Sequence, residues 1–119
     1  MNSLMINFEE YEYYIRPGYT DMRKGAQKLS LMVQDEMNLN PFSKSVFLFC
    51  SRSRKTVKGI LWDGNGWFEL TKRLDCRSGF SWPRTEEASR HITLEDIRYL
   101  LKGADVFRTF PEYYPEIAG

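Results

Sequence analysis

The segment TDMRKG, which begins at Thr20, combines residue types that suit an anion. Thr20 or Asp21 is a candidate helix cap, and the first backbone N–H groups of a helix have no intrahelical partner. Arg23 and Lys24 are cations at the helix end that disfavours positive charge, and Gly25 costs about 1 kcal/mol relative to Ala in a first turn. All three choices become favourable if an oxyanion or phosphate binds there. The alternative is a structural turn with an Asp21 cap, solvated cations and a closely packed Gly25.

A basic middle region is the second candidate for binding. Residues 44–84 have a charge balance of +6, whereas residues 1–43 give −2 and residues 85–119 give −3. Within it, a basic loop and the segment that follows place cations beside two tryptophans, which suits contact with phosphates and stacking on bases. The alternative is a solvated loop next to two half-buried tryptophans. The residues concerned are Arg52, Arg54, Lys55, Lys58, Arg73, Trp62 and Trp67.

The sequence gives no support to catalysis. It has one histidine and lacks the motifs of serine hydrolases, P-loop NTPases and zinc proteases. Asp21 and Asp63 are explained as a cap and a turn residue, so no carboxylate cluster is assigned. Cys50 and Cys76 form no zinc motif or disulfide framework. We therefore expect no enzyme activity, no metal and no cofactor.

Composition and apolar patterning place the chain among soluble proteins. It has 119 residues, of which 42% are hydrophobic and 28% charged, as in a single globular domain. No apolar run reaches the about 18 residues of a membrane span, and no secretory signal is recognisable at the start. We expect a cytoplasmic protein that does not enter membranes.

Periodicity and turn residues predict the elements that position these side chains. We expect helices from Met22 to near Asn38 and from Thr93 to Gly103. Expected strands are 8–16, 46–50, 57–62, 67–74 and 79–83. This order predicts one α+β domain over residues 1–119, with an antiparallel sheet of about five strands and two helices. Its core spans 15–103, and an aromatic tail follows at 104–119.

The predicted hairpin has a definite register. A two-residue turn at Gly64-Asn65 places Trp62 opposite Trp67, Ile60 opposite Glu69 and Lys58 opposite Thr71. One face is then the core side and also receives Lys72, which must reach an edge or pair with an acid. The opposite face is half aromatic and half charged, so we expect it to be only partly covered. The core side contains Val57, Gly59, Leu61, Phe68, Leu70 and Leu74.

A series of short motifs runs along most of the chain. The motifs are TDMRKG at 20–25, PFS at 41–43, Phe47 and Phe49, KGILWDGNG at 58–66, KRL at 72–74, GFSWP at 79–83 and LLKG at 100–103. In this order they resemble the small accessory protein TnpB, or Orf-two-like protein, of the bacterial insertion sequences numbered sixty-six, which is distinct from the RNA-guided nuclease of the same name. The resemblance covers roughly residues 15–103.

The resemblance implies a non-catalytic helper in transposition that is encoded beside a separate transposase. It brings no catalytic residue with it. Our first hypothesis is an accessory protein that contacts DNA, such as the terminal repeats of the element, through the TDMRKG turn and the basic loop and hairpin. The alternative is an adaptor that binds the transposase or another accessory protein through the two tryptophans and the aromatic tail. The first hypothesis requires Arg23 and Lys24 to lie within reach of the basic loop.

Overall fold

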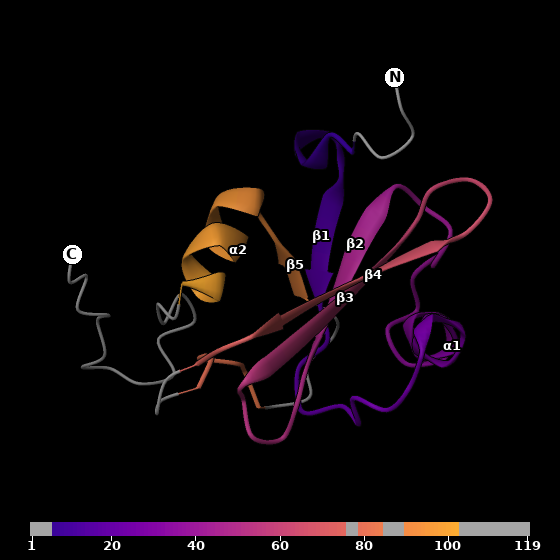
Figure 1. The fold of residues 1–119 in the computed structure, drawn as a ribbon. Coiled ribbons are helices and arrows are strands. Elements are labelled where there is room, and N and C mark those ends of the chain that lie inside the picture. Colours follow the sequence, from indigo (N-terminus) through magenta and orange to yellow (C-terminus); the bar gives the residue numbers. More distant parts are fainter. Residues whose placement is uncertain (1–5, 76–78, 85–89, 103–119) are drawn as a thin grey trace.

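The computed structural model describes residues 6–75, 79–84 and 90–102, which form a five-stranded sheet with one helix on each face (Figure 1). The strand order is β4-β3-β2-β1-β5. The elements are η1 (Phe8–Glu10), β1 (Glu12–Ile15), α1 (Ala26–Asp35), β2 (Ser45–Cys50), β3 (Thr56–Trp62), β4 (Trp67–Arg73), β5 (Arg90–Ile92) and α2 (Leu94–Leu101).

The sheet is mixed, which corrects the expected antiparallel sheet. β1 and β2 are parallel, with Tyr14 paired to Phe47, whereas every other neighbouring pair of strands is antiparallel. The physical reason is the connection between them: α1 carries the chain back along the sheet, and a strand that follows a crossover helix returns in the same direction. The α+β class with two helices describes the molecule.

The fifth strand is β5, and the strand expected at 79–83 is not formed. Residues 79–84 have no regular secondary structure. Their backbone forms hydrogen bonds with loops and not with a neighbouring strand. The Phe80 N–H donates to the Arg54 carbonyl at 2.6 Å, and the Pro83 carbonyl accepts from the Gly18 N–H at 2.8 Å. Phe80 and Trp82 are nevertheless buried, and the Trp82 indole N–H donates to the Arg16 carbonyl at 2.8 Å. The apolar character of this segment therefore serves core packing.

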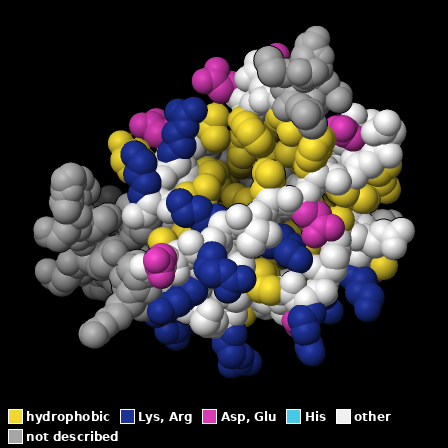
Figure 2. Space-filling model, in the orientation of Figure 1, with side chains coloured by type: hydrophobic (Ala, Val, Ile, Leu, Met, Phe, Trp, Pro, Cys, Tyr) yellow, Lys and Arg dark blue, Asp and Glu magenta, His cyan; other side chains and the backbone are white. Residues whose placement is uncertain are grey.

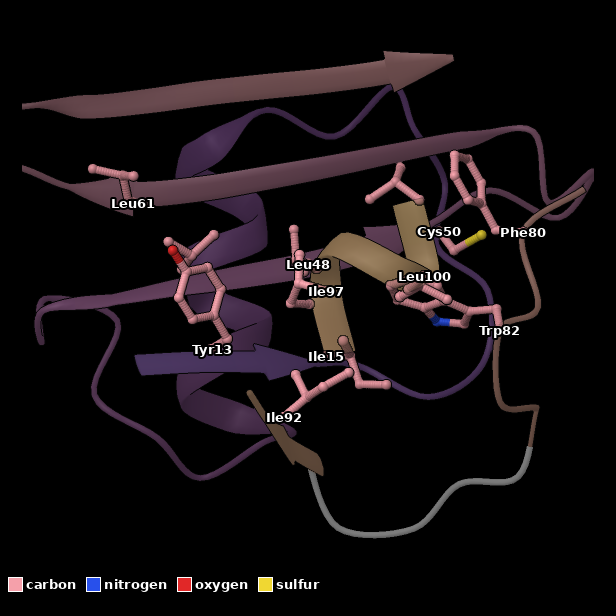
Figure 3. Close-up of a cluster of buried hydrophobic side chains, with 12 residues drawn as sticks. Tyr13, Ile15, Leu48, Cys50, Leu61, Phe80, Trp82, Ile92, Ile97 and Leu100 are labelled. Carbon is pink, nitrogen blue, oxygen red and sulfur yellow. The ribbon is translucent and has the colours of Figure 1, made fainter. Parts of the chain in front are cut away.

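Two hydrophobic clusters lie on opposite faces of the sheet. On one face, Leu48 and Cys50 of β2 pack with Ile97 of α2 and with Phe80 and Trp82 of the segment 79–84 (Figure 3). On the other, α1 covers a cluster formed by Leu29, Val33, Phe47, Phe49 and Ile60. Because helices cover both faces, all six residues of β2 are buried.

The first strand and the first helix begin later than expected. Residues 8–10 form the 3₁₀ turn η1 before β1 begins at Glu12. The N-cap of α1 is Gly25, not Thr20 or Asp21, so Arg23 and Lys24 precede the helix. The second helix agrees with its prediction, since the Thr93 hydroxyl accepts from the Asp96 N–H at 3.1 Å. The expected stop at Gly103 and the aromatic tail lie outside the described residues.

Candidate functional site

The hairpin that carries most of the predicted site has the expected register. Trp62 pairs with Trp67, and Lys58 pairs with Thr71. The Asp63 N–H closes the turn on the Gly66 carbonyl at 3.0 Å, and Gly64 has a φ of 110°, which side chains other than glycine rarely adopt. The face with Lys58 is more covered than expected, because α1 packs there and leaves Ile60 with no exposed surface.

Lys58 joins the TDMRKG turn to this hairpin. Its ammonium group donates to the main-chain carbonyls of Met22 and Lys24, each at 3.0 Å, and its side chain is only 14% exposed. A second bond ties the start of the turn, since the Thr20 N–H donates to the carbonyl of Cys50 at 2.8 Å. Cys50 ends β2 directly before the basic loop. The turn is thus held between the end of β2 and the middle of β3, beside that loop.

A carboxylate of the chain itself lies at the start of α1. One carboxylate oxygen of Glu69 accepts from the Ala26 N–H at 3.4 Å, and the other lies 3.7 Å from the Lys58 ammonium. The carboxylate therefore lies where a phosphate was considered from the sequence. Gly25 is exposed, and a Cβ there would have nothing within 4 Å, so the glycine does not serve close packing either.

Asp21 organises the turn and partly neutralises it. Its carboxylate accepts from the Arg23 N–H at 2.9 Å and lies 2.7 Å from the guanidinium of the same residue. These hydrogen bonds from Arg23 hold the pKa of Asp21 well below its usual range. The Arg23 side chain is 91% exposed, so it points to solvent while it is paired.

The basic loop is fixed by neighbouring backbone on two sides. The Lys55 carbonyl accepts from the Leu74 N–H at 2.7 Å, and the Arg54 carbonyl accepts from Phe80. Arg54 has a φ of 64°, which is uncommon for a residue other than glycine. Arg73 is exposed and pairs with Thr56, directly after the loop.

Six cations thus come from three segments that hydrogen bonds place together. We refer to their side chains as the cationic surface: Arg23, Lys24, Arg52, Arg54, Lys55 and Arg73. Within the described part of the chain, Lys24, Lys55 and Arg73 have no ion-pair partner. Figure 2 shows Lys and Arg side chains gathered in the lower part of the view, below a group of hydrophobic side chains. Lys58 is not part of this surface, but its two hydrogen bonds hold the TDMRKG turn against β3.

The two tryptophans lie together in an aromatic cluster. The ring centroids of Trp62 and Trp67 are 5.1 Å apart, and Phe42 lies 5.1 Å from Trp62 and 5.6 Å from Trp67. Phe42 is 54% exposed. Phe42 was not predicted as a site residue, although its motif PFS is one of the segments that carry the family resemblance. We refer to these three residues as the aromatic cluster.

The described residues give little support for a metal site or a reactive cysteine. No group of three metal-ligating side chains occurs in residues 6–75, 79–84 and 90–102. Burial raises the pKa of the Cys50 thiol to about 12, which removes its nucleophilic form at neutral pH. Neither helix that the structure describes has the length and apolar character needed to cross a membrane. Cys76 lies outside the described residues.

Comparisons with known proteins agree with the family resemblance. The sequence matches the family described as IS66 Orf2 like protein over residues 11–110, which extends the resemblance at both ends. The uncharacterized protein y4hO of Sinorhizobium fredii (strain NBRC 101917 / NGR234) is 42% identical over 92 residues, which cover 77% of this chain and 79% of that protein. The uncharacterized protein y4jC of the same strain is 27% identical over 85 residues, or 71% and 72% of the two chains. No solved structure matches significantly.

Proposed function

The chain belongs to the family of IS66 Orf2 like proteins, and from this premise we propose that it is a non-catalytic accessory protein of transposition that contacts DNA. Family membership indicates the accessory role in transposition. The contact with DNA is our own inference, and we assign it to the cationic surface. The other partners in this proposal are the transposase and a further accessory protein of the same element.

One observation carries the proposal: Lys58 holds the TDMRKG turn beside the basic loop through two hydrogen bonds of 3.0 Å. They act together with the bond of 2.8 Å from the Thr20 N–H to the Cys50 carbonyl, so the cations of the turn lie beside those of the loop. Duplex DNA carries one negative charge per about 1.7 Å of its axis, so a rigid cluster of cations can meet several phosphates at once. Because hydrogen bonds already hold the backbone of the turn and the loop, binding has to order only the side chains of these cations.

The kind of contact follows from the side chains. Lys24, Lys55 and Arg73 can each donate to phosphate oxygens without first breaking an ion pair. Arg23 must exchange Asp21 for a phosphate, so its contribution should be smaller. Phosphate contacts of this kind carry no base sequence, and the proposed surface therefore positions DNA and does not select a sequence.

The test is a titration of the purified full chain with two duplexes. One carries the terminal repeats of the element, and the other has the same length and a random sequence. We expect both to bind, with an affinity that falls steeply as the salt concentration rises. Binding that is absent at low salt, or that does not change with salt, would contradict the proposal. Specific selection of the terminal repeats would require base contacts outside the cationic surface.

The aromatic cluster supports a second candidate function, that of a protein adaptor. Phe42 is more than half exposed while it packs against two tryptophans, and aromatic residues are enriched at protein interfaces. An adaptor would bind the purified transposase with little salt dependence and would lose this binding in Phe42→Ser. The cationic-surface variants would leave it unchanged. The two functions use different residues, so one set of variants separates them.

A further inference from the structure

An apolar groove lies on the face of the sheet that α2 only partly covers. It is a cavity of about 300 Å³ whose walls come from β1 to β4 and from α2. The helix lies near β1 and β5, and among the described residues no helix lies over the part of this face on β3 and β4 (Figure 1). Six residues that line the groove are Tyr13, Val46, Leu48, Leu70, Ile97 and Leu101.

Most apolar residues of the groove are buried, whereas Phe8 and Leu70 are exposed. Leu70 on β4 is 39% exposed, although it shares a face with the buried Leu61. Gly59 lies opposite Leu70, and the Leu48 side chain packs closely over it, because a Cβ at Gly59 would come within 2.9 Å of that side chain. An apolar groove with exposed hydrophobic side chains is typical of a binding site.

The rim of the groove is positively charged. Lys72 of β4 and Arg98 of α2 both line it, and both are exposed. The side chain of Arg98 lies 4.0 Å from a carboxylate oxygen of Glu9. An occupant that suits this groove therefore combines large apolar side chains with acidic ones.

The chain itself contains such a segment immediately after the groove. Helix α2 ends at Leu101, which lines the groove, and the aromatic tail, residues 104–119, begins three positions later. The tail carries three acids and one arginine, and its large apolar residues include Phe107, Phe110, Tyr113 and Tyr114. An extended chain covers about 3.3 Å per residue. Neighbouring strands lie about 4.8 Å apart, so only a few residues are needed to pass from β1 to β4.

We propose that the aromatic tail of the same chain occupies this groove. The aromatic side chains cover Leu70 and the other apolar walls of the groove, and the acids of the tail face Lys72 and Arg98. This inference is independent of the DNA contact, because the groove and the cationic surface share no residue. It also makes the tail unavailable as a free adaptor segment while it is docked.

The test is limited trypsin digestion of the full chain, followed by mass spectrometry of the cut after Arg108. In the parent we expect this cut to be several-fold slower than in a free peptide of residues 103–119. Leu70→Glu should restore the rate of the free peptide, and Lys72→Glu should raise the rate more at low salt than at high salt. Leu31→Glu is the matched control, because Leu31 is 56% exposed on α1, away from the groove.

Each other outcome would overturn the proposal. A cut in the parent as fast as in the peptide means that the tail is not docked. Equal rates in Leu31→Glu and Leu70→Glu mean that the groove is not the site. Protection that appears only at high protein concentration means that the tail of a second copy is the occupant. Should Leu70→Glu fail to fold, a photo-crosslinking benzoylphenylalanine at Phe110 supplies an independent readout, expected to map to β3, β4 or α2 and not to the aromatic cluster.

Discussion

The ammonium of Lys58 and the main-chain carbonyl of Lys24 are 3.0 Å apart, although the two residues are separated by 34 positions in the sequence. This bond shows why a lysine lies on a face of β3 that α1 otherwise covers with apolar contacts. Its charge is shared between two carbonyls and the Glu69 carboxylate. Lys58 is thus a positioning residue, and the cations that remain available to a partner are those of the cationic surface.

Replacing Lys58 should therefore weaken folding. In Lys58→Met, two main-chain carbonyls lose their donor and the Glu69 carboxylate loses its counter-ion, so we expect a loss of about 1–3 kcal/mol in the free energy of unfolding. Chemical denaturation followed by tryptophan fluorescence measures this loss. Lys28→Met is the control, because Lys28 is exposed on α1 and should change stability little. Equal stability of the two variants would mean that these bonds contribute nothing.

The structure changes the expectation for Gly25. In a first helical turn, Gly25→Ala would stabilise the helix, but Gly25 is the N-cap and has no side-chain hydrogen bond. At an N-cap, alanine is worse than glycine and serine is better by about a few tenths of a kcal/mol. We expect Gly25→Ser to raise the free energy of unfolding and Gly25→Ala to lower it. The opposite order, measured by the same denaturation experiment, would contradict the assignment of the cap.

The hairpin register was predictable because its causes are local. A two-residue turn with Gly64 and alternating side chains fixes which residues face each other, and a slip of one position would move Ile60 out of the core. The pairing of β1 with β5 has no such signal, since β5 has only three residues and its partner precedes it by more than seventy positions. The prediction of a strand at 79–83 was wrong because a short apolar segment that is buried without pairing has the same sequence pattern as a buried strand.

The candidate site was predictable in composition and less so in arrangement. The sequence placed Lys58 and Glu69 on one face of the hairpin, yet it assigned Lys58 to an outside partner. In the structure the Lys58 ammonium bonds the TDMRKG turn instead, because this turn packs on β3. That contact joins segments far apart in the sequence, so no local pattern predicts it. The register itself held the missing signal: Glu69 faces Ile60, so it lies diagonally next to Lys58.

Gly79 should not tolerate a side chain. A Cβ at this position would lie 2.5 Å from both the Cβ and the carbonyl oxygen of Arg54, so the backbone must shift. We expect Gly79→Ala to cost about 1–3 kcal/mol of unfolding free energy through overpacking. Gly66→Ala is the matched control, because a Cβ at Gly66 would meet nothing within 4 Å. Thermal melting of both variants checks the difference, and a Gly79→Ala variant as stable as Gly66→Ala would contradict it.

Stability should fall in alkaline solution because of Cys50. Burial raises the pKa of its thiol from 9.0 to about 12, so between these values the unfolded chain loses a proton that the folded chain keeps. The stability that burial of the neutral thiol provides is fully present below pH 9.0 and is lost as the pH rises above it. Urea unfolding across this range measures the slope, which should be shallower in Cys50→Ala. In the folded protein, iodoacetamide should leave the peptide with Cys50 unmodified.

The contact with DNA predicts a graded set of salt dependences. For each phosphate contact that is lost, the slope of log affinity against log salt should decrease in magnitude by about 0.9. Lys24→Gln and Arg73→Gln should each show this decrease, whereas Arg23→Gln should show less, because Asp21 already neutralises Arg23. The same titrations with both duplexes should give equal changes, since phosphate contacts do not depend on sequence.

Lys44→Gln is the matched control for this series. Lys44 belongs to the same basic region of the sequence but precedes β2, whereas the basic loop follows it, and its ammonium pairs with Glu10 at 2.8 Å. The six residues of β2 place its two ends, and hence Lys44 and the basic loop, about 20 Å apart. Lys44 should therefore not share the phosphates that the loop binds. We expect the parent slope in Lys44→Gln. If Lys44→Gln lowers the slope as much as Lys24→Gln, the attraction depends on overall charge, and the arrangement that Lys58 imposes on the turn is not what binds DNA.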